Sequence, residues 1–355
     1  MIITRTPFRL SLFGGGTDYP AWYLKNGGLV IATSMAYYCY ISCRFLTPFF
    51  DYKTRVVYSE IEAVKEHKDI RHPAARACLE FLEMEKGIEI HHDGDLPART
   101  GIGSSSSFTV GLLAALHGLR HEMLTKERLA EEAIHIEQRV LNENVGIQDQ
   151  ILAAYGGLRV IEMGPGPDYC VTPLILAPDY LRELQDHILL GFTGITRVAS
   201  TIASKYIKVM EKKDDRFDEM HSITREALGT LRQNRDLERI GRLLHRSWML
   251  KRSLAGDVTR PEIDALYEAG RRAGAYGGKL LGAGGGGFMM FLAPPECHER
   301  IWAALPQIKT WVPFRMDNQG SQIVFYHDGY SYGQDGKPLR EIAQGVTHEE
   351  SERTL

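Results

Sequence analysis

The order of hydrophobic and polar positions predicts mostly strands in residues 1–60. IITRTPFRLSLF alternates roughly between the two kinds, GGGTD interrupts it, and LVIATSMAYYCYISCRFL is a long run rich in β-forming residues. Farther along, apolar residues recur with a helical period over about 73–86, 105–119 and 126–141, and again from Gln148. IEIHHDGDLP and GLRVIEM return to the pattern of strands. The first half of the chain is therefore expected to mix sheet and helix.

The second half begins with a predicted strand, DHILLGFTG, and then becomes mostly helical. Helical periods are expected over about 197–213, 216–232, 237–252 and 261–274. KLLGAGGGGFMMFLAP and SQIVFYHD predict strands again, with an amphipathic helix near about 295–305 between them. Because strands and helices mix without a strict β-α-β alternation, the predicted fold class is α+β.

A chain of 355 residues is long for one hydrophobic core, so two domains are expected. The proline- and glycine-bearing stretch MGPGPDYCVTPLILAPD, residues 163–179, is the best candidate for the linker. It predicts an N-terminal domain of residues 1–175 and a C-terminal domain of residues 176–332. From Tyr332 the chain turns polar, and residues 333–355 are expected to form a loosely docked tail.

The composition narrows the class of protein. Hydrophobic residues make up 44% and charged residues 25%, which is ordinary for a soluble globular protein. The net charge of -3, without a long run of one sign, argues against nucleic acid or an anionic membrane as partner. No apolar stretch is long enough to span a bilayer and no signal-peptide core is visible, so a cytoplasmic protein is expected. The five cysteines form no C-x-x-C pair, which indicates neither a disulfide framework nor a zinc ribbon. The oligomeric state stays open, with a homodimer as one option.

The most informative segment is LPARTGIGSSSSFTVGLLAAL, residues 96–116. Two closely spaced glycines let a backbone approach a ligand, and the apolar helix that follows directs N–H groups and a positive dipole end at the same point. This combination predicts a phosphate site, although a plain serine-capped helix is the alternative. No lysine follows the second glycine, so the segment is not a Walker A loop. The residues expected to bind phosphate are Gly101, Gly103, Ser104, Ser105, Ser106 and Ser107.

Two further glycine-rich loops stand out. Gly282, Gly284 and Gly287 match G-x-G-x-x-G, but FMMFLA reads as a buried strand where a dinucleotide fingerprint needs a helix. The run of four glycines indicates either a close approach by another group or a tight hairpin. In FGGGTDYP, residues 13–20, Asp18 is either an acceptor for substrate hydroxyls or part of a turn.

Two carboxylates near the phosphate loop in sequence are candidates for metal binding and catalysis. Glu137 lies on a predicted polar helix and Asp149 follows a break at VGIQDQ. A magnesium–nucleotide site needs one or two carboxylates and a hydroxyl, and a kinase benefits from a carboxylate that accepts the proton of the acceptor hydroxyl. The alternative for Glu137 is an ordinary solvent-facing side chain. His117 and His121 lack the glutamate of H-E-x-x-H and are expected to be surface or helix-packing residues.

Three segments together resemble the GHMP kinase family, which includes galactokinase, homoserine kinase, mevalonate kinase and phosphomevalonate kinase. TPFRLSLFGGGTDY is similar to its first motif, PARTGIGSSSS to its second and KLLGAGGGGF to its third. The resemblance implies a ribosomal-protein-like N-terminal domain and a ferredoxin-like C-terminal domain, with the active site between them. It also implies ATP and Mg²⁺ as cofactors and a sugar or sugar phosphate as substrate.

The resemblance assigns roles to individual residues. Ser105 and Glu137 match the magnesium ligands, Asp149 the aspartate at the acceptor hydroxyl, and Arg9 an arginine near the transferred phosphate. Galactokinases carry Glu-His where this chain has Gly15-Gly16, so their galactose contacts are not expected here. The residues expected to line the substrate site are Gly16, Thr17, Asp18, Arg197, Gly284 and Gly285.

Within the family, GGGTD, VGIQDQ and FTGITRVAS look more like the D-glycero-D-manno-heptose 7-phosphate kinases. These enzymes phosphorylate the anomeric hydroxyl to give the 1,7-bisphosphate, on the way to nucleotide-activated heptose for capsule or lipopolysaccharide. Arg197, at a strand-to-helix junction, is expected to bind the sugar phosphate or, equally, to be an exposed arginine. The rival expectations are a sugar-1-kinase for a hexose such as mannose or fucose, and a non-catalytic sensor.

Overall fold

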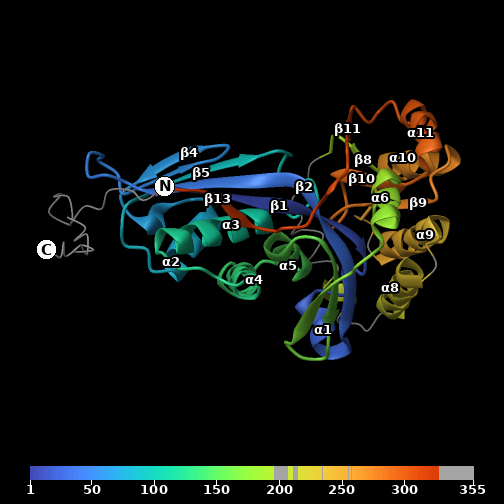
Figure 1. The fold of residues 1–355 in the computed structure, drawn as a ribbon, viewed down its shortest axis with the longest axis horizontal. Coiled ribbons are helices and arrows are strands. Elements are labelled where there is room, and N and C mark those ends of the chain that lie inside the picture. The colour runs from blue at the N-terminus through green and yellow to red at the C-terminus, as the bar shows by residue number, and fades with distance from the viewer. Residues whose placement is uncertain (196–206, 211–214, 234, 255, 257, 328–355) are drawn as a thin grey trace, which may run out of the picture.

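Two β-sheets with helices packed on them make up the protein (Figure 1). The computed structural model describes residues 1–195, 207–210, 215–233, 235–254, 256 and 258–327. The larger sheet has nine strands and the smaller one has four. This mixture of sheets and helices confirms the predicted α+β class.

The larger sheet is built around two long antiparallel strands, β1 (Ile2–Phe13) and β2 (Gly28–Phe45). Its main path runs β13-β1-β2-β5-β3-β4; β6 and β12 also pair with β2, and β7 pairs with β6. Among the described strands of this sheet, only β3 and β5 pair in parallel. The remaining strands are β3 (Thr54–Val57), β4 (Ile61–Val64), β5 (Ile88–Gly94), β6 (Leu158–Met163), β7 (Tyr169–Pro173), β12 (Met316–Asp317) and β13 (Gln322–Tyr326).

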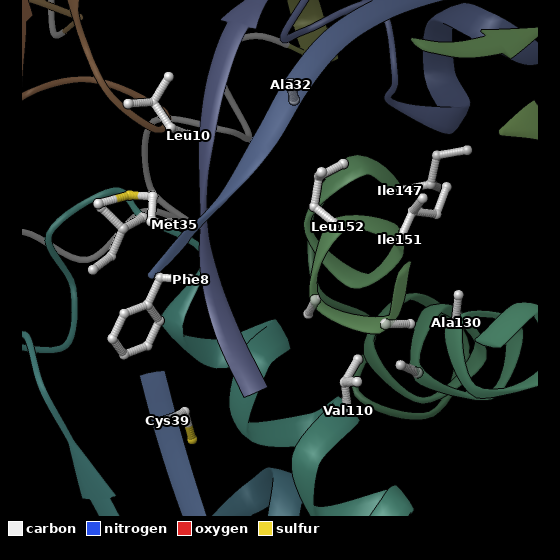
Figure 2. Close-up of a cluster of buried hydrophobic side chains, with 14 of the residues drawn as sticks. Phe8, Leu10, Ala32, Met35, Cys39, Val110, Ala130, Ile147, Ile151 and Leu152 are labelled. Atoms are coloured by element: carbon white, nitrogen blue, oxygen red, sulfur yellow. The ribbon is translucent and has the colours of Figure 1, made fainter. Parts of the chain in front are cut away.

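Helices cover one face of this sheet, and α3 (Ser104–Leu119) lies directly against β1 and β2. It is apolar on nearly all sides because it is enclosed by the sheet and by other helices. Its Gly111 allows the close approach, since a Cβ there would lie 2.8 Å from Thr6 Oγ1. Figure 2 shows part of this core, with side chains from the two strands and from α3, α4 and α5. The other helices of this half are α1 (Pro20–Asn26), η1 (His67–Asp69), α2 (Pro73–Phe81), α4 (Lys126–His135), the π-helical turn η2 (Ile136–Val140) and α5 (Gln148–Tyr155).

The smaller sheet is antiparallel throughout, in the order β11-β8-β10-β9. Its strands are β8 (Ile188–Phe192), β9 (Gly277–Leu280), β10 (Phe288–Leu292) and β11 (Thr310–Val312). Helix α9 (Leu237–Leu254) packs on β9 and on α8 (Asp215–Gln233), and Figure 1 shows these elements beside one end of the larger sheet. The other helices here are α6 (Pro178–Asp186), α10 (Pro261–Arg272), η3 (Pro295–Cys297) and α11 (His298–Ala304).

The expected domain boundaries, 1–175 and 176–332, stay predictions. Two strands of the second range, β12 and β13, pair with β2 and β1 of the larger sheet. The expected linker 163–179 contains β7, because this strand finds a partner in β6. Most of the expected helix 197–213 and all of the tail 333–355 lie outside the described residues.

Candidate active site

The phosphate loop enters α3 through two glycines with left-handed backbone, Gly101 at φ 81° and Gly103 at φ 75°. Gly103 is the N-cap of α3, and no side chain caps the helix. The serine-capped helix that the sequence offered as an alternative is therefore not what the structure shows. The first turn of an α-helix has N–H groups without helical partners, and these N–H groups suit an anion. Binding of ATP phosphates by Ser104 to Ser107 stays a prediction.

Arg9 of β1 and Asp149 of α5 form a two-pronged ion pair beside this loop. Arg9 Nε donates to Asp149 Oδ1 at 2.6 Å and Arg9 Nη2 donates to Oδ2 at 2.7 Å. Arg9 Nη1 also donates to the Gly101 carbonyl at 2.5 Å. A Cβ on Gly103 would lie 3.2 Å from Asp149 Oδ2, so this carboxylate oxygen faces the start of α3. The two residues expected to be catalytic are thus brought together at the phosphate loop.

Glu137 is fully buried behind the first turn of α3, which excludes the solvent-facing alternative. Its carboxylate accepts hydrogen bonds from Ser106 Oγ at 2.8 Å, from Thr109 Oγ1 at 3.0 Å and from Gln150 Nε2. Burial raises the pKa of Glu137 to about 7, although the hydrogen bond from Ser106 opposes this shift. Ser105, the serine expected to pair with Glu137, is exposed. On a helix, adjacent serines point in different directions, and here it is Ser106 that faces the carboxylate.

These residues fit a magnesium site. A buried carboxylate with a raised pKa gains from a nearby cation, and hydroxyl groups flank it. Among the described residues, no group of three or more His, Cys, Asp or Glu side chains could hold a metal ion. Mg²⁺ does not need such a group, because it commonly takes one or two carboxylates together with substrate phosphates and water. The roles of Glu137 and Ser105 as magnesium ligands stay predictions, and Ser106 joins them as a candidate.

Asp18 joins the 13–18 loop to the start of α5. Its carboxylate is fully buried and accepts from Gly16 N at 2.9 Å and from Gln148 Nε2 at 3.0 Å. Burial raises its pKa, and the charge of Asp149 adds to this effect. Thr17 is equally buried, and its hydroxyl donates to the Gly14 carbonyl at 2.8 Å. Both residues hold the loop in shape, and their contact with a sugar stays a prediction.

The third glycine-rich loop, residues 281–287, joins β9 to β10 as a hairpin and also packs on the phosphate loop. A Cβ on Gly282 would lie 2.6 Å from the Gly101 Cα, which is too close for a side chain. The two backbones can therefore touch only because residue 282 is a glycine. Phe288 N donates to the Thr100 carbonyl at 3.1 Å. Both interpretations of this loop, the hairpin and the close approach, are therefore present. β10 follows the glycines, which confirms that the G-x-G-x-x-G match is no dinucleotide fingerprint.

Gly284 and Gly285 face a different neighbour. A Cβ on Gly284 would lie 2.6 Å from the Val258 carbonyl oxygen, and Gly285 N donates to the same oxygen at 2.9 Å. Their expected substrate contacts stay predictions. Arg197 lies outside the described residues.

Two buried lysines near this site were missed by sequence reasoning. Lys251 Nζ of α9 donates to the Gly282 carbonyl at 2.5 Å, and Lys279 Nζ of β9 donates to the Leu12 carbonyl at 3.2 Å. Lys279 is three residues before Gly282 in the chain, which could have drawn attention to it. Lys251 has no such local signal, because only the packing of α9 against β9 brings it to the loop.

Comparisons with known proteins agree with the three motifs. The family models described as GHMP kinases N terminal domain and GHMP kinases C terminal match residues 68–157 and 224–308. The D-glycero-alpha-D-manno-heptose 7-phosphate kinase of Campylobacter jejuni is 30% identical over 329 residues, which cover 88% of this chain and 95% of that protein. A mevalonate kinase of Pyrococcus horikoshii is 28% identical over 263 residues, 70% of this chain and 72% of the relative.

Solved structures share the fold. A crystal structure named as a D-glycero-D-manno-heptose 1-phosphate kinase from Bacteroides thetaiotaomicron has a TM-score of 0.73 over 92% of this chain and all of that one. At 22% sequence identity, this match shows a shared fold and nothing further. Within the described part of the chain, no helix is long and apolar enough to cross a membrane. The two family models, the relative at 30% identity and the three glycine-rich loops at one site all agree. The chain therefore belongs to the GHMP kinase family.

Proposed function

We propose that the protein is an ATP-dependent kinase that phosphorylates the anomeric hydroxyl of D-glycero-D-manno-heptose 7-phosphate. The product would be the 1,7-bisphosphate, a precursor of nucleotide-activated heptose for capsule or lipopolysaccharide, made in the cytoplasm. The observation that carries the kinase chemistry is the Arg9–Asp149 pair at the left-handed Gly103, where α3 begins. The likeness to the Campylobacter jejuni enzyme supports the choice of sugar.

In this proposal, the anomeric oxygen attacks the γ-phosphorus of ATP and the bond from that phosphorus to the β-phosphate oxygen breaks. The proton of the hydroxyl passes to Asp149 Oδ2, the carboxylate oxygen that faces the phosphate loop. Arg9 holds both oxygens of Asp149 in place and supplies positive charge next to the transferred group. Mg²⁺, when bound near Glu137 and Ser105, would neutralise charge on the β- and γ-phosphates.

Turnover with a panel of acceptors tests the proposal. The panel contains the heptose 7-phosphate, the same heptose without its phosphate, mannose and fucose, with ADP release as the readout. We expect kcat/KM to fall about tenfold to a hundredfold when the terminal phosphate is missing, the effect of one charged hydrogen bond. Equal or better turnover of mannose or fucose would point to a hexose kinase. No turnover of any sugar would favour a binding protein with a kinase fold.

A further inference from the structure

Two ammonium groups are buried where the 281–287 loop meets β1 and the phosphate loop. Lys251 is 8% exposed and Lys279 is 5% exposed. In the described part of the chain, each donates one hydrogen bond, to the main-chain carbonyl of Gly282 or of Leu12. An ammonium group has three donors. Each lysine therefore has two N–H groups without a partner among the described residues.

The charges around these lysines leave an excess of positive charge. Arg9, Asp18 and Asp149 are the charged groups that act on Lys251, and Lys279 is affected by Arg9, Asp18 and Lys251. Three cations thus share two carboxylates. Both carboxylates already have closer partners, since Asp149 is held by Arg9 and Asp18 by backbone and amide N–H groups. Neither lysine forms an ion pair with them.

Such an arrangement is costly in the absence of an anion. Burial disfavours a charged ammonium group, and a buried charge is normally paired. Burial lowers the pKa of Lys251 to about 8, and the charge of Arg9 lowers it further. The pKa of Lys279 is lowered well below its usual value, first by burial and then by Lys251. Buried cations with free donors beside a phosphate loop are what a phosphate-binding site requires.

Two unpaired polar atoms, one in β1 and one at the start of α5, lie beside the 13–18 loop. Ser11 Oγ and Gln148 Oε1 are buried and have no hydrogen-bond partner among the described residues. A Cβ on Gly15 would lie 2.9 Å from Ser11 Oγ and 3.9 Å from Gln148 Oε1, so both atoms border the space that this glycine leaves. Ser11 directly precedes Leu12, whose carbonyl binds Lys279. Polar atoms without described partners therefore occur in the same end of β1 that Lys279 contacts.

We propose that Lys251 and Lys279 form a binding site for a phosphate group at the junction of the 281–287 loop with the end of β1. This inference rests on the proposed kinase function, which supplies two sources of the same chemistry. One is the phosphoryl group that ATP transfers, and the other is the terminal phosphate of the sugar. A purely structural role, in which each lysine only joins two loops through a carbonyl, is the competing explanation.

Proton uptake separates binding from a structural role. An anion stabilises the protonated lysine, so ligand binding above about pH 8 should take up a proton at Lys251. Calorimetric titrations in two buffers of different ionisation enthalpy measure this uptake. Three probes are titrated into the full chain: a non-hydrolysable ATP analogue with Mg²⁺, the heptose 7-phosphate, and inorganic pyrophosphate with Mg²⁺.

We expect proton uptake with the parent and less of it in Lys251→Met. We also expect the affinity for the same probe to fall about tenfold to a hundredfold in Lys251→Met and in Lys279→Met. An effect on the ATP analogue and pyrophosphate assigns the site to the transferred group, and an effect on the heptose 7-phosphate assigns it to the sugar phosphate. Lys126→Met is the matched control, because Lys126 also donates to main-chain carbonyls, those of Tyr155 and Gln319, away from the loops.

Unchanged affinities for all three probes in both lysine variants would overturn the proposal. If the methionine variants do not fold, the glutamine variants replace them. Absence of proton uptake by the parent with every probe would also overturn the proposal. The pyrophosphate titration keeps this test separate from the proposed function, because it requires no correct sugar. A parent that phosphorylates no sugar would refute the function, while loss of pyrophosphate binding in Lys251→Met would still support the lysine site.

Discussion

Replacing Asp149 by asparagine removes the carboxylate charge while nearly conserving its shape. The carboxylate now accepts two hydrogen bonds from Arg9, at 2.6 and 2.7 Å. An asparagine side chain has only one acceptor oxygen, so one nitrogen of Arg9 loses its partner. Arg9 keeps its bond to the Gly101 carbonyl, which should hold the guanidinium near the phosphate loop.

The magnitude follows from these contacts. Loss of one hydrogen bond to a charged group should lower the free energy of unfolding by about 1.5–3 kcal/mol. Loss of the base should lower kcat by about a hundredfold to ten-thousandfold. On the activation free energy, this loss corresponds to about 2.7–5.4 kcal/mol. Affinity for ATP and Mg²⁺ should change little. Asp149 contacts Arg9, whereas the candidate metal ligand Glu137 is contacted by Gln150, so the substitution leaves these contacts of Glu137 in place.

A single-turnover experiment with quenched samples measures the chemical step, and nucleotide titration of the same variant measures binding. Asp264→Asn is the matched control, because Asp264 also pairs with an arginine, Arg252 at 3.0 Å, and its side chain is similarly exposed. The control should keep the parent rate. The assignment of Asp149 fails if Asp149→Asn keeps more than about a tenth of the parent rate with chemistry rate-limiting. Weaker nucleotide–magnesium binding with a nearly normal rate would instead make Asp149 a support of the metal site.

Three further predictions concern other parts of the molecule. Glu137→Gln should raise the Mg²⁺ concentration for half-maximal activity and lower kcat by about tenfold to a hundredfold, because a charged ligand is lost. Gly282→Ala should lower kcat/KM by about a hundredfold, since its Cβ would lie 2.6 Å from the Gly101 Cα and displace the phosphate loop. Burial alone would lower the pKa of His117. Its hydrogen bonds to carboxylates, the largest effect coming from Glu132, outweigh burial, so the pKa of His117 is raised. The charged imidazole therefore stabilises the fold below about pH 6.5, and this contribution is lost as the pH rises through the raised pKa. His117→Leu should accordingly lower the free energy of unfolding more near about pH 6 than near pH 9.

Each of these has a control and a contradicting result. Glu132→Gln, a buried glutamate outside the site, should leave the magnesium titration unchanged, and an unchanged titration in the Glu137 variant would exclude its metal role. Gly164→Ala has open space for a Cβ and should keep full activity. If Gly282→Ala is equally active, contact between the two loops does not position the phosphates. A loss of stability in His117→Leu that is the same at both pH values in urea titrations would contradict the linkage.

The fold was predictable where local patterns decide the structure. The alternation in IITRTPFRLSLF and the apolar run after Gly103 became β1 and α3. The return of β13 to the edge of the larger sheet was not predictable, because pairing between strands more than 300 residues apart leaves no local signal. A different reason explains why β7 was mistaken for linker, since its partner β6 directly precedes it in the chain. The prolines and glycines of residues 163–179 lie mostly outside β7, and pairing with β6 decides its conformation.

The site residues, too, were predictable only where a sequence motif marks them. The resemblance to the GHMP kinases pointed to Arg9 and Asp149, and the structure places them in contact. The hydrogen bond from Ser106 to Glu137 was not predictable, because it depends on the rotation of α3, which a run of four serines does not reveal. Lys251 was missed because a lysine on an amphipathic helix is normally exposed, and only the packing of α9 on β9 buries it.

Phosphorus NMR of the reaction product shows which hydroxyl of the sugar receives the phosphoryl group. The heptose 7-phosphate is incubated with ATP, Mg²⁺ and the parent protein until ADP formation stops. We expect one new phosphorus signal that is coupled to the anomeric proton, with the signal of the 7-phosphate retained and one ADP formed per product molecule. A new signal coupled to any other ring position, or no new signal while the protein still binds ATP, would contradict the proposed function.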